Sequence, residues 1–95
     1  MAPAITQDRY KLVFFVPAAN AQKVKYAVFA TGAGTIGLYD KTCFVISGVG
    51  EFVPAADATP HIGAPGKPEK VEELRIETQC TGQEMVRNAI EAIKA

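Results

Sequence analysis

The sequence predicts a small α+β domain in which two helices cover one face of an antiparallel sheet. Strand-like apolar runs occupy residues 9–16, 41–46 and 69–80. Apolar residues recur at helical spacing in residues 20–31 and 81–95. Two helices are too few to enclose a sheet on both faces, so we expect the other face to be covered by association with another chain.

The first predicted strand carries apolar side chains on both of its faces. Val13 and Phe15 point to one face, and the residues between and beside them point to the other: Leu12, Phe14 and Val16. Asn20 is placed to cap the helix that follows. That helix is expected to end near Thr31, with Gly32 in the left-handed conformation that often follows a helix.

The second strand, residues 41–46, runs into Gly48-Val49-Gly50, which we interpret as a turn. Residues 51–53 then form a short return strand before Pro54, so the expected order is β-α-β-β-β-α. Residues 55–68 hold three prolines and two glycines without periodicity, which predicts a long loop.

The third apolar run, residues 69–80, alternates with period two. Its apolar or small residues share one face: Leu74, Ile76, Thr78 and Cys80. Its charged residues share the other: Glu73, Arg75 and Glu77. Thr81 and Glu84 have the spacing of a capping box at the start of the second helix, which is expected to run to the end of the chain.

Composition limits the possible partners of this chain. Ten Lys and Arg balance ten Asp and Glu among 95 residues, and no basic block is present, so we expect no nucleic-acid partner. No apolar run approaches the length of a membrane span and the start lacks signal-peptide features, so we expect a cytoplasmic protein with no membrane partner. Cys43 and Cys80 are interpreted as buried thiols, and a disulfide is not indicated. A domain of this size buries little surface alone, which favours association.

Five strings resemble, in order, the PII/CutA-like domain of the YqfO family, whose members are related to NGG1p-interacting factor: "YKLVFFVP", "GAGTIGLYDKTCF", "GVGEF", "IGAPGK" and "VEELRIET". The resemblance implies one ferredoxin-like, PII/CutA-like domain over residues 1–95, with its core in 9–94, that forms trimers. It implies no established activity for the free-standing form. Members usually continue after the second helix into a last strand, whereas this sequence stops at Ala95, so either the chain is truncated there or the last family strand is missing. Members usually carry a polar residue where this chain has Leu38.

Metal and cofactor sites are not expected. In the fused relatives of the resembled family, the ligands of two metal ions lie in flanking domains that this sequence does not contain. A zinc site built from Cys43, Cys80 and His61 matches no known ligand spacing. No pattern of a nucleophile with its base is present, so no catalytic residue is predicted.

The glycines of the string from Gly32 to Gly37 have the G-x-G-x-x-G spacing of dinucleotide-binding loops. Such a loop needs a strand before it and a helix after it, and here the predicted order is reversed. We therefore interpret these glycines as turn residues. An anion held by successive backbone N–H groups stays open as an alternative.

A second candidate ligand region is the long loop. Gly66 and Lys67 lack the remaining residues of a phosphate loop. Because ligands of PII-like trimers lodge between subunits near long loops, the resemblance favours a polar cluster of His61 and Lys67. The full set of candidate ligand-binding residues is Gly34, Gly37, Tyr39, His61, Gly66 and Lys67.

The candidate interface combines apolar and charged residues of one sheet face: Val13, Phe15, Glu73, Arg75 and Glu77. Paired acid and base catalysis by the carboxylates is the competing interpretation, and we favour the interface. The sequence thus predicts a non-enzymatic, homo-oligomeric module, a trimer by resemblance, that binds a small ligand or a protein. The alternatives are a nucleotide-directed, cyclohydrolase-like enzyme and a structural partner of a fused YqfO-family protein.

Overall fold

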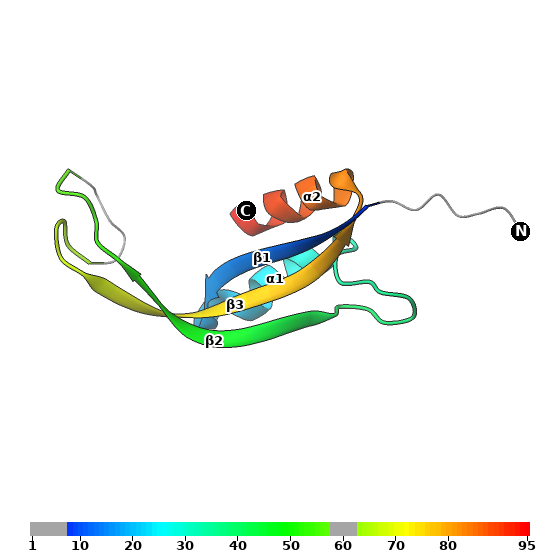
Figure 1. The fold of residues 1–95 in the computed structure, drawn as a ribbon, viewed down its shortest axis with the longest axis horizontal. Coiled ribbons are helices and arrows are strands. Elements are labelled where there is room, and N and C mark those ends of the chain that lie inside the picture. Colours follow the sequence, from blue (N-terminus) through cyan, green and yellow to red (C-terminus); the bar gives the residue numbers. More distant parts are fainter. Residues whose placement is uncertain (1–7, 58–62) are drawn as a thin grey trace, which may run out of the picture.

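The computed structural model describes residues 8–57 and 63–95. Its elements are β1 (Arg9–Pro17), a 3-10 turn (Ala18–Asn20), α1 (Ala21–Phe29), β2 (Cys43–Phe52), β3 (Glu69–Thr81) and α2 (Gln83–Lys94), as Figure 1 shows. The α+β class is confirmed, with one three-stranded antiparallel sheet and two helices. Neither helix in this part of the chain has the length and apolar character needed to cross a bilayer.

The sheet has the order β1-β3-β2, so the last strand in the chain lies between the other two. β1 pairs with residues 73–81 of β3 only, from Pro17 opposite Glu73 to Arg9 opposite Thr81. β2 pairs along the opposite edge of β3, from Cys43 opposite Thr78 to Phe52 opposite Glu69. Beyond Glu73, β2 and β3 therefore continue as a two-stranded arm, residues 49–52 and 69–72, which extends away from the helices (Figure 1).

The predicted turn at Gly48-Val49-Gly50 is wrong, because β2 passes through these residues as one continuous strand. Neither glycine has the positive φ that a tight hairpin turn requires. Both are paired with β3, Gly48 with Glu73 and Gly50 with Val71, so the expected return strand at 51–53 is the end of the same strand. The described chain accordingly has three strands where the sequence predicted four.

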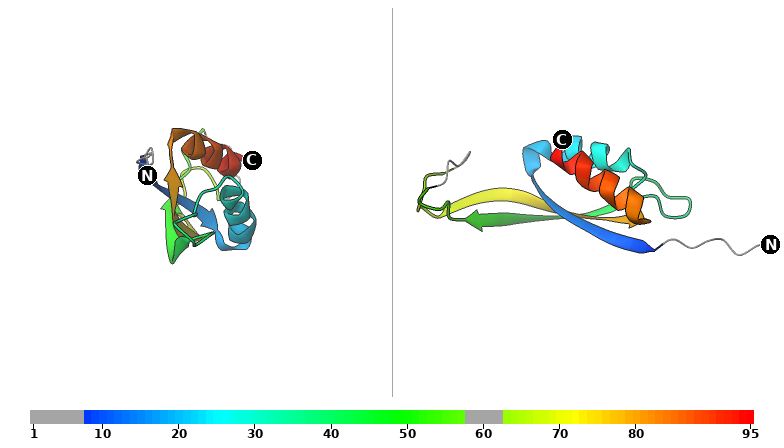
Figure 2. Two further views of the ribbon diagram at one scale, coloured as in Figure 1. Left: turned by 90° about the vertical axis from the view of Figure 1, so that its right-hand side faces the viewer. Right: turned by 90° about the horizontal axis from the view of Figure 1, so that it is seen from above.

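Both helices pack on one face of the sheet, as the two views of Figure 2 show. The strand residues predicted to point inward do so, because Phe14, Val16, Ile76 and Cys80 are buried among apolar side chains. Thr78 is buried with them, and its hydroxyl donates a hydrogen bond of 2.8 Å to the carbonyl of Thr42. Without this bond the Thr78 hydroxyl would be buried with no hydrogen-bond partner.

The helix ends differ from expectation in their capping. Gly32 follows α1 with φ +99°, as predicted, but the Asn20 side chain makes no capping bond. The predicted capping box at Thr81 and Glu84 is wrong, because Thr81 is still paired in β3 and α2 starts at Gln83. The Thr81 N–H instead donates to the Met85 sulfur at 3.3 Å.

The arm makes the molecule long. Its extents are 61, 23 and 17 Å, and its radius of gyration is 16.6 Å, whereas a compact domain of roughly 100 residues has about 13 Å. The arm ends in the long loop predicted over residues 55–68, whose described residues, 55–57 and 63–68, contain no helix or strand. His61 lies outside the described residues.

Candidate functional site

The sheet face opposite the helices carries large apolar side chains in contact with solvent. Two rows of residues cross this face in the strand order β1, β3, β2: Val13, Glu77 and Phe44, then Phe15, Arg75 and Ile46. Phe15 is 59% exposed and Phe44 56%, although both belong to strands that are paired with β3. We call the six residues of these rows the open face.

The charged residues of the open face are paired with one another. The Arg75 side chain donates to Glu77 at 3.0 Å, and the Lys11 ammonium lies 3.4 Å from the same carboxylate. These two contacts, the Arg75 hydrogen bond first, hold the pKa of Glu77 below its usual range. The Arg75 guanidinium also lies 5.8 Å from the centroid of the Phe15 ring. Because Arg75 and Glu77 of the open face neutralise each other, the other four residues of this face present apolar side chains to a partner.

Glu73 completes the set of residues predicted for the interface. Val13, Phe15, Glu73, Arg75 and Glu77 share one face, since each occupies the alternate strand position to a residue of the core. The Glu73 carboxylate lies where a side chain at Gly50 would begin. Glycine at position 50 thus allows Glu73 to lie flat across β2, and the role of this surface as an interface stays a prediction.

The glycine loop between α1 and β2 is held to the end of β3 by its second glycine. The Gly34 N–H donates to the Gln79 carbonyl at 2.8 Å, and the Gly34 carbonyl accepts from the Thr42 N–H at 2.9 Å. Gly34 has φ +86°, and a Cβ there would lie 2.9 Å from the Thr42 nitrogen. The glycine is therefore required by this close approach of two backbone segments.

The tip of the same loop is a tight turn that projects into solvent. Ile36 and Tyr39 exchange two backbone hydrogen bonds of 2.9 Å around Gly37, which has φ +56°, and Leu38. Leu38 and Tyr39 are both exposed. The loop follows α1 and precedes β2, so the order that argued against a dinucleotide loop is confirmed.

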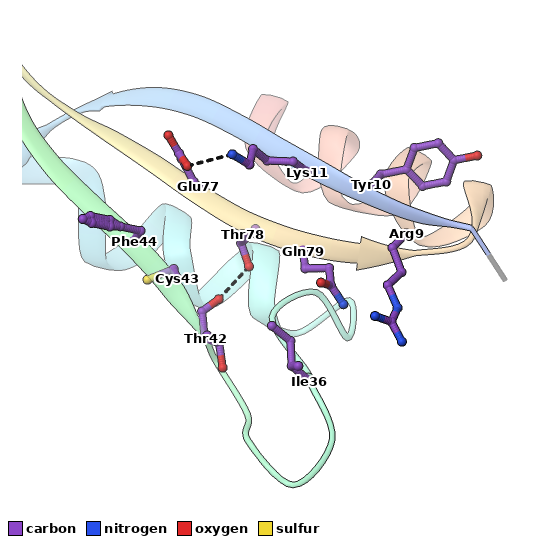
Figure 3. Close-up of a pocket in the computed structure, with 10 residues that line it drawn as sticks. All are labelled: Arg9, Tyr10, Lys11, Ile36, Thr42, Cys43, Phe44, Glu77, Thr78 and Gln79. Carbon is purple, nitrogen blue, oxygen red and sulfur yellow. Dashed lines mark hydrogen bonds and ion pairs between the residues drawn. The ribbon is translucent and has the colours of Figure 1, made fainter. Parts of the chain in front are cut away.

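A pocket of about 350 Å³ lies between this loop and the open face. Figure 3 shows its lining, with Arg9 and Lys11 from β1, Gln79 from β3, Phe44 from β2 and Ile36 from the loop. The helices lie behind the strands in this view, so the pocket opens on the helix-free side of the sheet (Figure 3). It combines cationic, amide and apolar groups, which is the usual make-up of a small-molecule site.

The residues predicted to bind a ligand do not meet within one chain. Gly34, Gly37 and Tyr39 belong to the loop at one end of the molecule, while Gly66 and Lys67 lie at the tip of the arm at the other end (Figure 1). At the arm, the Gly66 N–H donates to the Pro54 carbonyl at 2.7 Å, which folds the loop back on itself. His61 cannot be placed in either group, since it lies outside residues 8–57 and 63–95.

Both cysteines are free thiols. Cys80 is buried in the core, where burial raises the pKa of its thiol, while Cys43 is half-buried. Within the described ranges, no three His, Cys, Asp or Glu side chains are grouped so that they could hold a metal ion.

Comparison with known proteins places this fold among one group of bacterial proteins. The chain is 44% identical over 81 residues, 85% of its length, to a GTP cyclohydrolase 1 type 2 homolog of Halalkalibacterium halodurans. It is 40% identical over 78 residues, 82% of its length, to the protein of the same name from Bacillus subtilis. The crystal structure of a Bacillus cereus protein related to NIF3 matches 97% of the chain with a TM-score of 0.80 and 37% identity.

This chain is homologous to one segment of the proteins of the NIF3-related (YqfO) family. It spans 22% and 21% of the length of the two relatives and 23% of the Bacillus cereus chain. No protein-family model matches it. The family named from the sequence strings is thus supported, whereas its PII/CutA-like character rests on resemblance alone.

Sequence reasoning missed part of the site in this NIF3-related segment. Phe44 and Ile46 belong to the open face, and Arg9 belongs to the pocket, yet none was predicted. Phe44 and Ile46 alternate as Val13 and Phe15 do, but alternation alone does not tell which face a strand presents. Only the register, which sets Phe44 opposite Glu77, assigns them to the face away from the helices.

Proposed function

We propose that this chain is a non-catalytic binding module that works as a homo-oligomer, a trimer of PII/CutA-like domains with a ferredoxin-like plan. The observation that carries the proposal is the open face, where Phe15, Phe44 and Ile46 remain exposed on the two strands that flank β3. Exposed apolar patches of this kind mark association sites in proteins that are otherwise well packed.

The arm supports the same proposal. A two-stranded hairpin is at best marginally stable in water by itself, since it has too little apolar surface to bury. Here Val49 and Phe52 of the arm, and Val53 directly after it, are exposed although they are large and apolar. A second copy of the chain that covers the arm and the open face would bury these side chains and supply the missing contacts.

The edges of the sheet offer a further means of assembly. β1 and β2 each use one edge to pair with β3, and no other strand of residues 8–57 and 63–95 pairs with their outer edges. Such edges pair readily with a further strand. Homo-oligomers usually close their interfaces by rotational symmetry, which shields the edges from continued addition of copies.

The test is the mass of the native protein and its response to one charge on the open face. We expect native mass spectrometry and light scattering at micromolar concentration to give three times the 10.1 kDa of one chain. Phe44→Lys is expected to shift the mass toward that of the monomer, because a lysine placed in an apolar interface loses its hydration. The new lysine would lie opposite Glu77, so the fold of the single chain should tolerate it.

Tyr26→Lys is the matched control. Tyr26 is 54% exposed, almost as much as Phe44, but it lies on α1 in the helix layer. Tyr26→Lys should leave the mass of the assembly unchanged, whereas Phe44→Lys should lower that mass. A monomer mass for the native protein, or equal masses for the two variants, would refute assembly through the open face, and a stable dimer would refute the trimer.

Two competing functions are tested on the same sample. The relatives are named GTP cyclohydrolase 1 type 2 homologs, so a nucleotide-directed enzyme is the second candidate. Product formation from GTP by the purified chain, lost when the chain is inactivated, would favour that candidate over a binding module. A structural partner of a fused family member is the third, and stoichiometric co-purification with such a protein would favour it.

A further inference from the structure

The pocket between the glycine loop and the open face contains a cation without an acidic partner. Lys11 is engaged by Glu77 at 3.4 Å, and Glu77 is engaged in turn by Arg75 at 3.0 Å. Arg9 also lines the pocket, but it makes no ion pair with any carboxylate of residues 8–57 and 63–95. The charged side chains of the lining are thus two cations, Arg9 and Lys11, and one carboxylate, Glu77, which leaves a net positive charge.

Hydrogen-bond donors lie on the same side as the uncompensated cation. Figure 3 shows the Arg9 guanidinium and the Gln79 carboxamide projecting beside one another, close to Ile36 of the loop. A guanidinium presents a planar array of N–H donors that matches the paired oxygens of a carboxylate or phosphate. This end of the pocket is therefore suited to an oxyanion.

The other end of the pocket is apolar. Phe44 lines this end of the pocket from β2, whereas Ile36 of the loop lies nearer to Gln79 (Figure 3). In the single chain the ring of Phe44 is more than half exposed, so a flat ligand can stack on it and remove apolar surface from water. The ligand competes for this ring with the second copy of the proposed assembly. The backbone anchors at Gly34 hold the loop, and with it Ile36, to the end of β3.

We propose that this pocket binds a small molecule in which a flat apolar group carries an oxyanion, that is, an aromatic carboxylate or an aromatic phosphate. Arg9 and Gln79 bind the oxyanion, and Phe44 and Ile36 contact the flat group. The inference rests on the proposed binding function and adds the class of ligand to it. It involves no chemical step, because the pocket holds the ligand without changing it.

The probe is phenyl phosphate, titrated into the uniformly ¹⁵N-labelled protein and followed by amide chemical shifts. Benzoate is titrated in parallel, so that a preference for phosphate or carboxylate is measured. Inorganic phosphate and phenol serve as the two halves of the probe. We expect saturable shifts at the amides of Phe44 and Gln79, and affinity for phenyl phosphate at least about tenfold above that for either half.

Three variants assign the binding to the pocket. Arg9→Gln should weaken phenyl phosphate about tenfold, because it removes a charge-assisted hydrogen bond. Phe44→Leu keeps an apolar side chain and should weaken it about threefold by removing the ring. Arg87→Gln is the control, since Arg87 is an exposed arginine of α2 that pairs with Glu84 away from the pocket.

The outcomes separate this inference from the assembly proposal, because the oligomer mass is measured on the same samples. Because assembly covers Phe44, the titration is repeated on protein diluted until it is monomeric. A monomer whose amides show no saturable shift with either aromatic anion overturns the ligand class, while the mass before dilution still tests assembly. A protein that is monomeric before dilution and binds phenyl phosphate through Arg9 supports the pocket and overturns assembly. Equal losses for Arg9→Gln and Arg87→Gln, or equal affinity for phenyl phosphate and inorganic phosphate, would also overturn the inference.

Discussion

Gly34→Ala tests whether the glycine loop is held by a close approach of two backbone segments. A Cβ at this position would lie 2.9 Å from the nitrogen and 3.0 Å from the carbonyl oxygen of Thr42, and 3.2 Å from the Phe29 ring. Two of these neighbours are backbone atoms, which cannot move without shifting the start of β2. We therefore expect the variant to lose the hydrogen bonds that Gly34 makes with Gln79 and Thr42.

The magnitude follows from two contributions. An alanine at φ +86° has a strained backbone, which costs about 1–2 kcal/mol. Each lost backbone hydrogen bond contributes about 0.5–1.5 kcal/mol net. The expected fall in the free energy of unfolding is therefore about 2–5 kcal/mol, a large part of the stability of a small domain.

Gly37→Ala is the matched control. Gly37 also has a positive φ, +56°, but no atom lies within 4 Å of the position of its Cβ. The control should therefore lose only the backbone contribution, about 1 kcal/mol. Both variants lower the entropy of the unfolded chain in the same way, so this effect cancels in the comparison.

The assay is equilibrium unfolding in urea, followed by far-ultraviolet circular dichroism. All samples are measured at one chain concentration, because association adds a concentration-dependent contribution. The midpoint should fall further for Gly34→Ala than for Gly37→Ala, with the slope unchanged. Equal midpoints for the two variants would show that the contact with Thr42 contributes nothing to stability.

The remaining predictions concern titration and thiol chemistry. The pKa of Glu77 in the folded chain is lowered, so its ion pairs stabilise the protein fully above the ordinary glutamate pKa of 4.5 and are lost as pH falls through the lowered pKa. NMR titration should therefore give a midpoint below 4.5. Arg75→Gln should raise that midpoint more than Lys11→Gln, because the Arg75 hydrogen bond is the larger cause; equal effects would contradict this assignment. Iodoacetamide should modify the half-buried Cys43 of the folded chain before the buried Cys80, and a reversed order would contradict the described core.

Local sequence patterns were sufficient where a residue's environment depends on its near neighbours. The alternation in residues 74–80 correctly separated the buried Ile76 and Cys80 from the exposed face of Arg75. Gly32 was correctly placed after a helix, because the left-handed conformation at that position strongly favours glycine. These two predictions depend only on the period of one strand and on the conformational freedom of one glycine.

Local patterns failed where pairing with a distant strand decided the outcome. Gly48 and Gly50 were interpreted as a turn, yet each is extended and paired with β3. Thr81 was interpreted as a helix cap, yet it pairs with Arg9 at the far end of the chain. A turn or cap preference amounts to about 1 kcal/mol, and a continuous antiparallel ladder with its side-chain contacts can outweigh it.

The sequence alone determined that this protein is an α+β domain with two helices, a β1 strand that is apolar on both sides, and too few helices to cover both faces of its sheet. Only the tertiary structure decided the strand order, the length of the arm, and the meeting of Arg9, Phe44 and Gln79 around one pocket. The reason is that an element's period is set by neighbouring residues, whereas register joins residues more than thirty positions apart, such as Phe44 and Glu77.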